Sequence, residues 1–263
     1  AYDMMAEAFE LSERLKEPVL LRIVPRLAHS RAAVETGEAR GETKMTPSTD
    51  QWVLLPGIAR KKYAALLDKQ PAMEKAAAES KYNRVENNGG NVGIIACGIA
   101  YNYVKEAIGD KGNILKVSQY PLPAEAIRTL AASNDSLLVV EDGQPVVEQD
   151  VKALVGAGYR VEGRLAGALP RTGELNPDNV AAALGKPSAV AYGVAKNLAG
   201  RPPQLCQGCG HRDVYGALVN IIEEYPDARV FGDIGCYTLG ALPPFKALSS
   251  CVDMGASITM AKG

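Results

Sequence analysis

The stretch Val92-Gly-Ile-Ile-Ala-Cys97 opens the part of the chain that decides the fold. It is a short apolar run of the length of one buried strand. Similar runs follow it and alternate with amphipathic segments, so strands are expected over 92–96, 114–117, 137–140 and 159–161, with helices near 101–108, over 124–132 and near 146–155. This alternation with short connections is typical of parallel βαβ units. The sequence therefore predicts an α/β fold with a doubly wound domain over residues 90–165.

The flanking segments extend this α/β pattern less regularly. On the amino-terminal side, Tyr2–Leu15 has a helical rhythm, and the apolar run Val19–Val24 is expected to form a buried strand. Residues 36–89 are polar, with helical runs over 60–70 and 71–83, and are interpreted as a connector between domains. Residues 166–200 are rich in Gly, Pro and polar residues, which indicates a linker with one short helix over 177–184.

A third unit is expected from residue 201 onward. Asp213–Glu224 has one apolar helical face, Arg229–Phe231 is predicted as a short strand, and another helix starts after Met254-Gly-Ala-Ser257. The loop Gly232-Asp-Ile-Gly-Cys-Tyr-Thr-Leu-Gly240 follows the short strand. In open α/β sheets ligands bind at this end of the strands.

Composition excludes several classes of function. The chain of 263 residues has 29 Lys and Arg against 30 Asp and Glu, for a net charge of −1. Such a balance gives no positive field for a nucleic-acid backbone or an anionic membrane. Its apolar runs are far shorter than the ~20 residues that cross a bilayer. Five cysteines in a long chain argue against a disulfide framework, so we expect a reducing, cytoplasmic setting.

The pair Cys206-Gln-Gly-Cys209 is the first candidate for chemistry. Its spacing suits two ligands of one metal or cluster, a redox dithiol, or two buried thiols, and the pair alone does not decide among them. Cys236 lies in the glycine-rich loop and could converge with the pair. Since His211 is the nearby imidazole, a zinc site is an alternative.

The glycine-rich loop is the second candidate. Its three glycines would let backbone amides approach an anion such as a diphosphate, although a plain turn between strand and helix is the simpler interpretation.

Two further residues are expected to have structural roles. Glu141 is interpreted as a carboxylate in a turn, and Cys97 as a small buried hydrophobic residue.

Several motifs in a fixed order carry a resemblance to a known family. They are Pro18–Arg22, Arg26–Arg31, Val140–Glu148, Leu169–Leu175, Cys206–Arg212, Gly232–Gly240 and Met254–Ile258. Together they cover nearly the whole chain and resemble the thiamine-diphosphate-dependent 2-oxoacid:ferredoxin oxidoreductases, in particular alpha subunits of the indolepyruvate type. Each motif is weak alone, whereas their order is highly specific.

The resemblance implies a domain organisation and an activity. Residues 1–35 would be the end of a pyrimidine-binding domain, 90–165 a transketolase C-terminal-like domain, and 201–263 the start of a diphosphate-binding domain. The implied reaction converts an aryl 2-oxoacid to its acyl-CoA, with electrons passed to ferredoxin. Implied cofactors are thiamine diphosphate, Mg²⁺ and a [4Fe–4S] cluster, and implied partners are coenzyme A, ferredoxin and a beta subunit in a hetero-oligomer.

The resemblance also implies site residues. Cys206, Cys209 and Cys236 resemble three early thiolate ligands of the cluster. The segments that resemble cofactor-contacting loops comprise Asp233, Ile234, Gly235, Cys236, Tyr237, Met254, Gly255, Ala256 and Ser257. The acid that activates the aminopyrimidine would precede Ala1, and the magnesium motif and fourth cluster ligand would follow Gly263. We therefore expect no turnover by this segment alone.

Two other functions remain open at this point. A non-oxidative thiamine-diphosphate-dependent decarboxylase would use the same coenzyme without a cluster, against which the three cysteines weigh. A non-catalytic α/β module would instead hold a structural zinc at Cys206, Cys209, His211 and Cys236.

Overall fold

The computed structural model describes residues 1–38, 41, 53–186, 197, 199–200 and 202–263. The chain forms two compact units, residues 1–191 and 192–263, and each is described here by itself. Of the predicted linker, residues 187–196 and 198 lie outside the described residues, as does residue 201, where the third unit was expected to begin. Among the described helices, none is both long and apolar enough to span a membrane.

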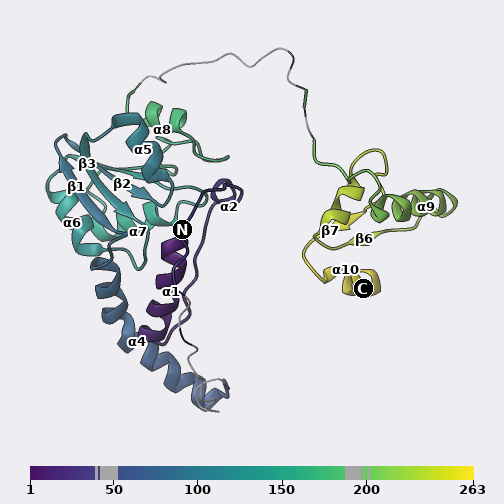
Figure 1. Ribbon diagram of the computed structural model, residues 1–263, viewed down its shortest axis with the longest axis horizontal. Helices are drawn as coiled ribbons and strands as arrows, with labels where there is room; N and C mark the ends of the chain where they lie inside the picture. Colours follow the sequence, from purple (N-terminus) through teal and green to yellow (C-terminus); the bar gives the residue numbers. More distant parts are fainter. Residues whose placement is uncertain (39–40, 42–52, 187–196, 198, 201) are drawn as a thin grey trace. The chain divides into compact units, whose positions relative to one another are not determined.

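A five-stranded sheet is the centre of the first unit (Figure 1). Its strands, in the order β1-β3-β2-β4-β5, are β1 (Arg84–Asn88), β2 (Val92–Cys97), β3 (Gly112–Val117), β4 (Ser136–Val140) and β5 (Val161–Glu162). Strands β2 to β5 pair in parallel, which confirms the predicted α/β fold and its doubly wound sheet. Strand β1 is antiparallel to β3 and lies at the edge of the sheet. The sequence did not predict it, because Arg-Val-Glu-Asn-Asn is polar and mostly exposed, as edge strands often are.

Helices cover both faces of this sheet (Figure 1). Helices α5 (Ala100–Ile108) and α8 (Pro177–Ala183) pack on one face, and α6 (Ala124–Ala132) and α7 (Val146–Val155) on the other. Successive side chains of β2 point to opposite faces of the sheet. Ile94 therefore belongs to the apolar cluster under α5 and α8, and Ile95 to the cluster under α6 and α7. Because both faces are buried, the central strands are continuously apolar, which is the pattern that the sequence showed.

The amino-terminal segment differs in part from expectation. Helix α1 (Tyr2–Leu15) forms as predicted and is followed by the short α2 (Pro25–Ala28). The strand expected over Val19–Val24 was wrong: in the described part of the chain this run pairs with no strand, and Leu20 is 89% exposed. An apolar run becomes a strand only where a neighbour completes its backbone hydrogen bonds. The two helical runs after residue 56 are one helix, α4 (Pro56–Ala78), which continues through Pro71.

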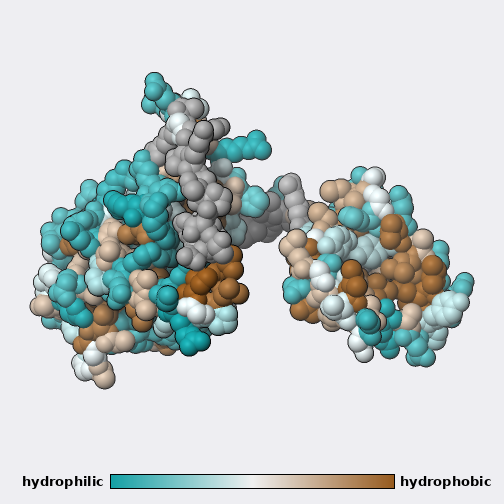
Figure 2. All heavy atoms as spheres, turned by 90° about the horizontal axis from the view of Figure 1, so that it is seen from below, coloured by the Kyte–Doolittle hydropathy of each residue, from teal (hydrophilic) through white to brown (hydrophobic). Residues whose placement is uncertain are grey.

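The second unit is smaller and has a small core. It contains α9 (Gly210–Glu224), β6 (Phe231–Gly232), the 3₁₀ helix η1 (Cys236–Ala241), β7 (Ser250–Cys251) and α10 (Ala256–Lys262). Strand β6 pairs in parallel with β7, which the sequence did not predict. The buried apolar residues of its core are Leu205, Tyr215 and Ala247. Much apolar surface is exposed on this unit (Figure 2), including Val214, Ile221, Met254 and Ile258.

Candidate functional site

A pocket of about 270 Å³ lies in the second unit beside the end of β6. Helix α9 provides one wall, and the chain around β6 and the start of α10 provides the other. The lining residues are His211, Val214, Tyr215, Leu218, Val230, Phe231, Gly232, Asp233, Tyr237, Leu248 and Ser257. The pocket is thus bordered by an imidazole, a carboxylate and two phenols on a largely apolar wall.

Two segments expected to contact a cofactor meet at this pocket. Because β6 and β7 are parallel, the chain that leaves β6 lies beside the chain that leaves β7. The backbone N–H of Ile234 donates to the carbonyl of Asp253 at 3.1 Å. The backbone N–H of Ser257 donates to Oδ1 of Asp233 at 2.7 Å. The structure therefore joins Asp233–Tyr237 to Gly255–Ser257, although Asp233 and Ser257 are 24 residues apart in sequence.

The Asp233 carboxylate is the electrostatic link between these segments. The backbone N–H of Ser257, then its side-chain hydroxyl, and also the backbone N–H of Gly255 hold the pKa of Asp233 below its ordinary value. Hydrogen bonds to the charged form of a carboxyl favour ionisation. Asp233 is therefore an anion that directly follows β6 and faces the first residues of α10.

The glycines of the loop allow close packing of aromatic rings. A Cβ on Gly235 would lie 2.6 Å from the ring of Tyr237, and one on Gly240 would lie 2.3 Å from the ring of Tyr215. The N–H of Gly235 donates to Oγ1 of Thr238 at 3.0 Å, and the N–H of Ile234 donates to the carbonyl of Asp253. These two amides are satisfied within the chain, so the loop does not present them to an anion in this conformation.

The cysteines of this unit lie in three places: the turn before α9, the start of η1 and β7. Cys206 is exposed, Cys209 is the partly buried residue before α9, and Cys236 is the exposed first residue of η1. Cys251 is partly buried on β7, and its Sγ lies 3.3 Å from the carbonyl oxygen of Asp233. All five cysteines of the chain are free.

No single-ion metal site is preformed among the described residues, where no group of three or more His, Cys, Asp or Glu side chains could hold a metal ion. The zinc alternative at Cys206, Cys209, His211 and Cys236 therefore finds no support. The ring of His211 instead packs edge-on against Tyr237, with 5.7 Å between ring centroids. A [4Fe–4S] cluster needs four ligands. The resemblance draws three of them from Cys206, Cys209 and Cys236 and the fourth from beyond Gly263.

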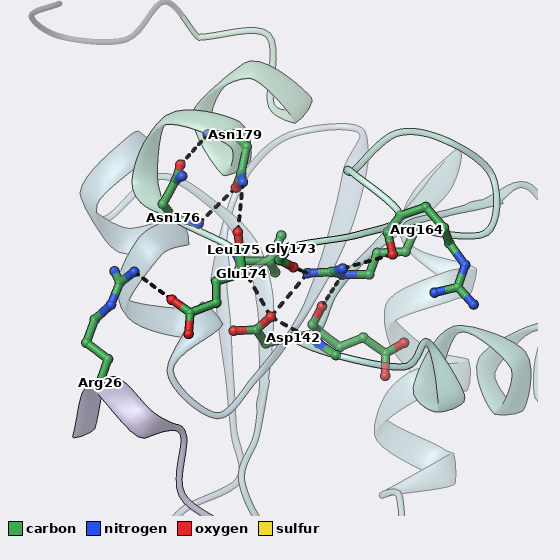
Figure 3. A network of polar contacts seen from close by, with 11 residues as sticks. Arg26, Asp142, Arg164, Gly173, Glu174, Leu175, Asn176 and Asn179 are labelled. Carbon is green, nitrogen blue, oxygen red and sulfur yellow. Dashed lines mark hydrogen bonds and ion pairs between the residues drawn. The ribbon is translucent and has the colours of Figure 1, made fainter. Parts of the chain in front are cut away.

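A second polar cluster lies in the first unit at the carboxyl end of β4 (Figure 3). Arg164, 3% exposed, was not singled out by the sequence. Its guanidinium donates to the carbonyls of Glu141, Arg171 and Gly173 and, at 3.1 Å, to Oδ1 of Asp142. These bonds close the loop after β5 against the end of β4. We assign this cluster a structural role, because the guanidinium is committed to partners within the chain.

Glu141 is buried beside this cluster rather than placed in an open turn. Its two carboxylate oxygens accept the backbone N–H groups of Val147 and Glu148 at 2.9 and 2.8 Å. Burial raises the pKa of Glu141, against the effect of these two hydrogen bonds. The carboxylate therefore caps the start of α7, which the sequence alone did not reveal.

A larger hollow of about 690 Å³ lies in the first unit. It is bordered by α1, residues 17–21, the end of α4 and residues 118–121. None of the residues that the sequence singled out for cofactor or metal binding lines it. The candidate site therefore remains the pocket beside β6.

Curated relatives resemble nearly the whole chain. The indolepyruvate oxidoreductase subunit IorA of Methanothermobacter thermautotrophicus is 37% identical over 97% of this chain and 45% of its own length. The subunit of the same name from Archaeoglobus fulgidus is 37% identical over 100% of this chain and 45% of its own length. The subunit from Pyrococcus abyssi is 32% identical over 100% of this chain and 44% of its own length. The chain thus spans about half the length of the curated relatives it matches. No protein-family model matches the chain. No solved structure matches it either.

Proposed function

Since this chain belongs to the family of the indolepyruvate oxidoreductase subunit IorA, we propose that it is part of an enzyme that oxidises an aryl 2-oxoacid of the indolepyruvate type. It spans about 45% of the length of these relatives. In this proposal the 2-oxoacid loses carbon dioxide, coenzyme A takes the acyl group, and ferredoxin takes the electrons. The chain would act in a hetero-oligomer with a beta subunit. The names of the relatives support the oxidoreductase class and the substrate, and the resemblance of the motifs supports the other parts.

We assign to the pocket beside β6 a role in holding thiamine diphosphate. When bound, this cofactor supplies the carbanion chemistry that decarboxylation of a 2-oxoacid requires. The observation that carries the assignment is the hydrogen bond between Asp233 and Ser257, because it joins the two segments whose sequences resemble cofactor-contacting loops. Convergence of distant segments on one concave surface is what a cofactor site requires.

The chain's own residues would orient and shield the cofactor. Asp233 fixes the end of β6 against the start of α10, so both segments keep one relative position. Tyr237 packs over the backbone of Gly235 and its ring contacts His211, which fixes the conformation of this side of the loop. Preorganisation of this kind lowers the cost of ordering the site when a ligand binds.

The Mg²⁺ ion and the [4Fe–4S] cluster stay predictions of the resemblance. The described residues offer one carboxylate at the pocket, Asp233, and three candidate cysteines, of which Cys206 and Cys209 share the turn before α9 and Cys236 lies on η1. Hard cations such as Mg²⁺ take several oxygen ligands. We derive no chemical step from either group.

The test uses the enzyme that contains this chain, purified without oxygen together with its partner subunit. Asp233→Ala should raise the Kd for thiamine diphosphate about ten-fold, measured by calorimetric titration, and should lower 2-oxoacid-dependent ferredoxin reduction. Asp227→Ala is the matched control, because Asp227 is an exposed aspartate of the same unit. An unchanged Kd in Asp233→Ala would remove the cofactor from this pocket.

A further inference from the structure

We propose that Cys206 and Cys209 form a redox-active dithiol, which closes reversibly to an intramolecular disulfide by exchange with a low-molecular-weight disulfide. The inference does not rest on the thiamine cofactor. It concerns the turn that precedes α9, and it gives these two thiols a chemistry other than metal binding.

The backbone already holds the two cysteines at a distance that suits a disulfide. The N–H of Cys209 donates to the carbonyl of Cys206 at 3.2 Å, which closes a four-residue turn. Such a turn keeps its first and last Cα atoms less than about 7 Å apart, and disulfides join Cα atoms about 4.4–6.8 Å apart. Closing the bond therefore requires little movement of the backbone.

Gly208 is the residue that makes this turn possible. Its φ is +75°, the left-handed value that type II turns require at their third position. No neighbouring atom lies within 4 Å of where a Cβ on Gly208 would be. Glycine is thus needed here for its backbone conformation rather than for space, so the turn is specified by the sequence.

The two sulfur atoms of the pair differ in accessibility. Cys209 is the residue before α9, a helix of 15 residues. Cys206 is exposed and Cys209 partly buried, so an incoming disulfide reaches Cys206 more readily. This arrangement provides one attacking thiol and one resolving thiol.

The other cysteines differ in a way that isolates this pair. Burial raises the pKa of Cys97, which keeps it a protonated thiol. Cys251 contacts the carbonyl of Asp233 on β7. Cys236 is exposed but lies on η1, and no turn joins it to another cysteine. Among the described cysteines, Cys206 and Cys209 are the two that a single turn holds together.

The exchange balances without any metal. The Cys206 thiolate attacks one sulfur of glutathione disulfide, which forms a mixed disulfide and releases one glutathione. The Cys209 thiolate then attacks the Cys206 sulfur and releases the second glutathione. The protein gives up two protons and two electrons, and one glutathione disulfide becomes two glutathione molecules. Because a disulfide sulfur is no longer a thiolate, the oxidised pair does not bind metal.

The experiment follows the thiols of the full chain, purified without oxygen and fully reduced. After incubation with glutathione disulfide, we expect the loss of two thiols and a peptide in which Cys206 is bonded to Cys209, both reversed by dithiothreitol. In Cys209→Ser, Cys206 should remain joined to glutathione because no resolving thiol is present. Cys236→Ser and Cys251→Ser are controls that should form the same disulfide as the unaltered chain.

Three results would overturn the proposal. The first is separate glutathione adducts on Cys206 and Cys209 with no bond between them. The second is a disulfide from either residue to Cys236 or Cys251. The third is a chain that retains iron and sulfide and whose Cys206 and Cys209 do not react. The circular dichroism of each serine variant shows that it is folded, and none of these results depends on whether thiamine diphosphate binds.

Discussion

The carboxylate of Asp233 lies 2.7 Å from the backbone nitrogen of Ser257 and accepts its hydrogen bond. This contact joins the residue that follows β6 to the second residue of α10. It connects the two segments that the sequence singled out for the same ligand. The geometry of the candidate site therefore depends on a charge that changes with pH.

Stability of the second unit should fall in acid through Asp233. Its pKa is lowered in the folded chain, so the unfolded chain binds the proton more tightly. The stabilising contribution is complete above the ordinary aspartate value of about 3.9 and is lost as the pH falls through the lower, folded value. Hydrogen exchange of residues 229–262, measured between neutral pH and pH 3, should show this loss. Asp233→Asn should remove this pH dependence and the control Asp227→Asn should not; equal profiles for the two variants would contradict the assignment.

Gly240→Ala should destabilise the second unit by about 2 kcal/mol. A Cβ there would lie 2.3 Å from the ring of Tyr215, which is buried and bonded through its hydroxyl to the carbonyl of Tyr237. The matched control is Gly216→Ala on α9, where nothing lies within 4 Å. That variant should stabilise the helix by about 0.5–1 kcal/mol. Urea unfolding of both variants measures the two effects, which should have opposite signs.

Arg164→Met should destabilise the first unit by about 3 kcal/mol. The change leaves Asp142 and three carbonyls without their buried donor. Arg160→Met is the control, because Arg160 pairs with Glu162 on the surface. Exposed pairs contribute little, so this variant should change stability by less than about 0.5 kcal/mol. Chemical unfolding followed by circular dichroism compares them, and equal losses would show that burial of Arg164 is not the cause.

Cys97 should react slowly with iodoacetamide at pH 8. Burial, and then the charge of Glu141, raise the pKa of its thiol, so little thiolate is present. Cys236 is exposed and provides the comparison within the same molecule. We expect alkylation of Cys97 to be roughly ten-fold slower or more, as measured by peptide mass spectrometry over time. Similar rates at the two residues would mean that Cys97 is open to solvent.

Periodicity and composition predicted the part of the fold that is buried on both sides. The apolar runs of β2, β3 and β4 and the amphipathic helices between them correspond to local patterns, so residues 92–155 were assigned to the right kinds of element. The same reasoning misassigned Val19–Val24 and missed β1. Whether a short segment is a strand depends on a neighbour that it meets only in space.

By itself, the sequence determined which residues are candidates: a Cys-Gln-Gly-Cys turn, a glycine-rich loop and a second motif around Met254–Ser257. Their residue types and spacing are local properties of the chain. Only the tertiary structure decided how they combine. It joined Asp233 to Ser257, placed the rings of Tyr237 and Tyr215 over the loop glycines, and left Cys206, Cys209 and Cys236 without a preformed metal site. Such contacts follow from the parallel pairing of β6 with β7 and from packing against α9. They join residues that are far apart in sequence, so no local sequence pattern predicts them.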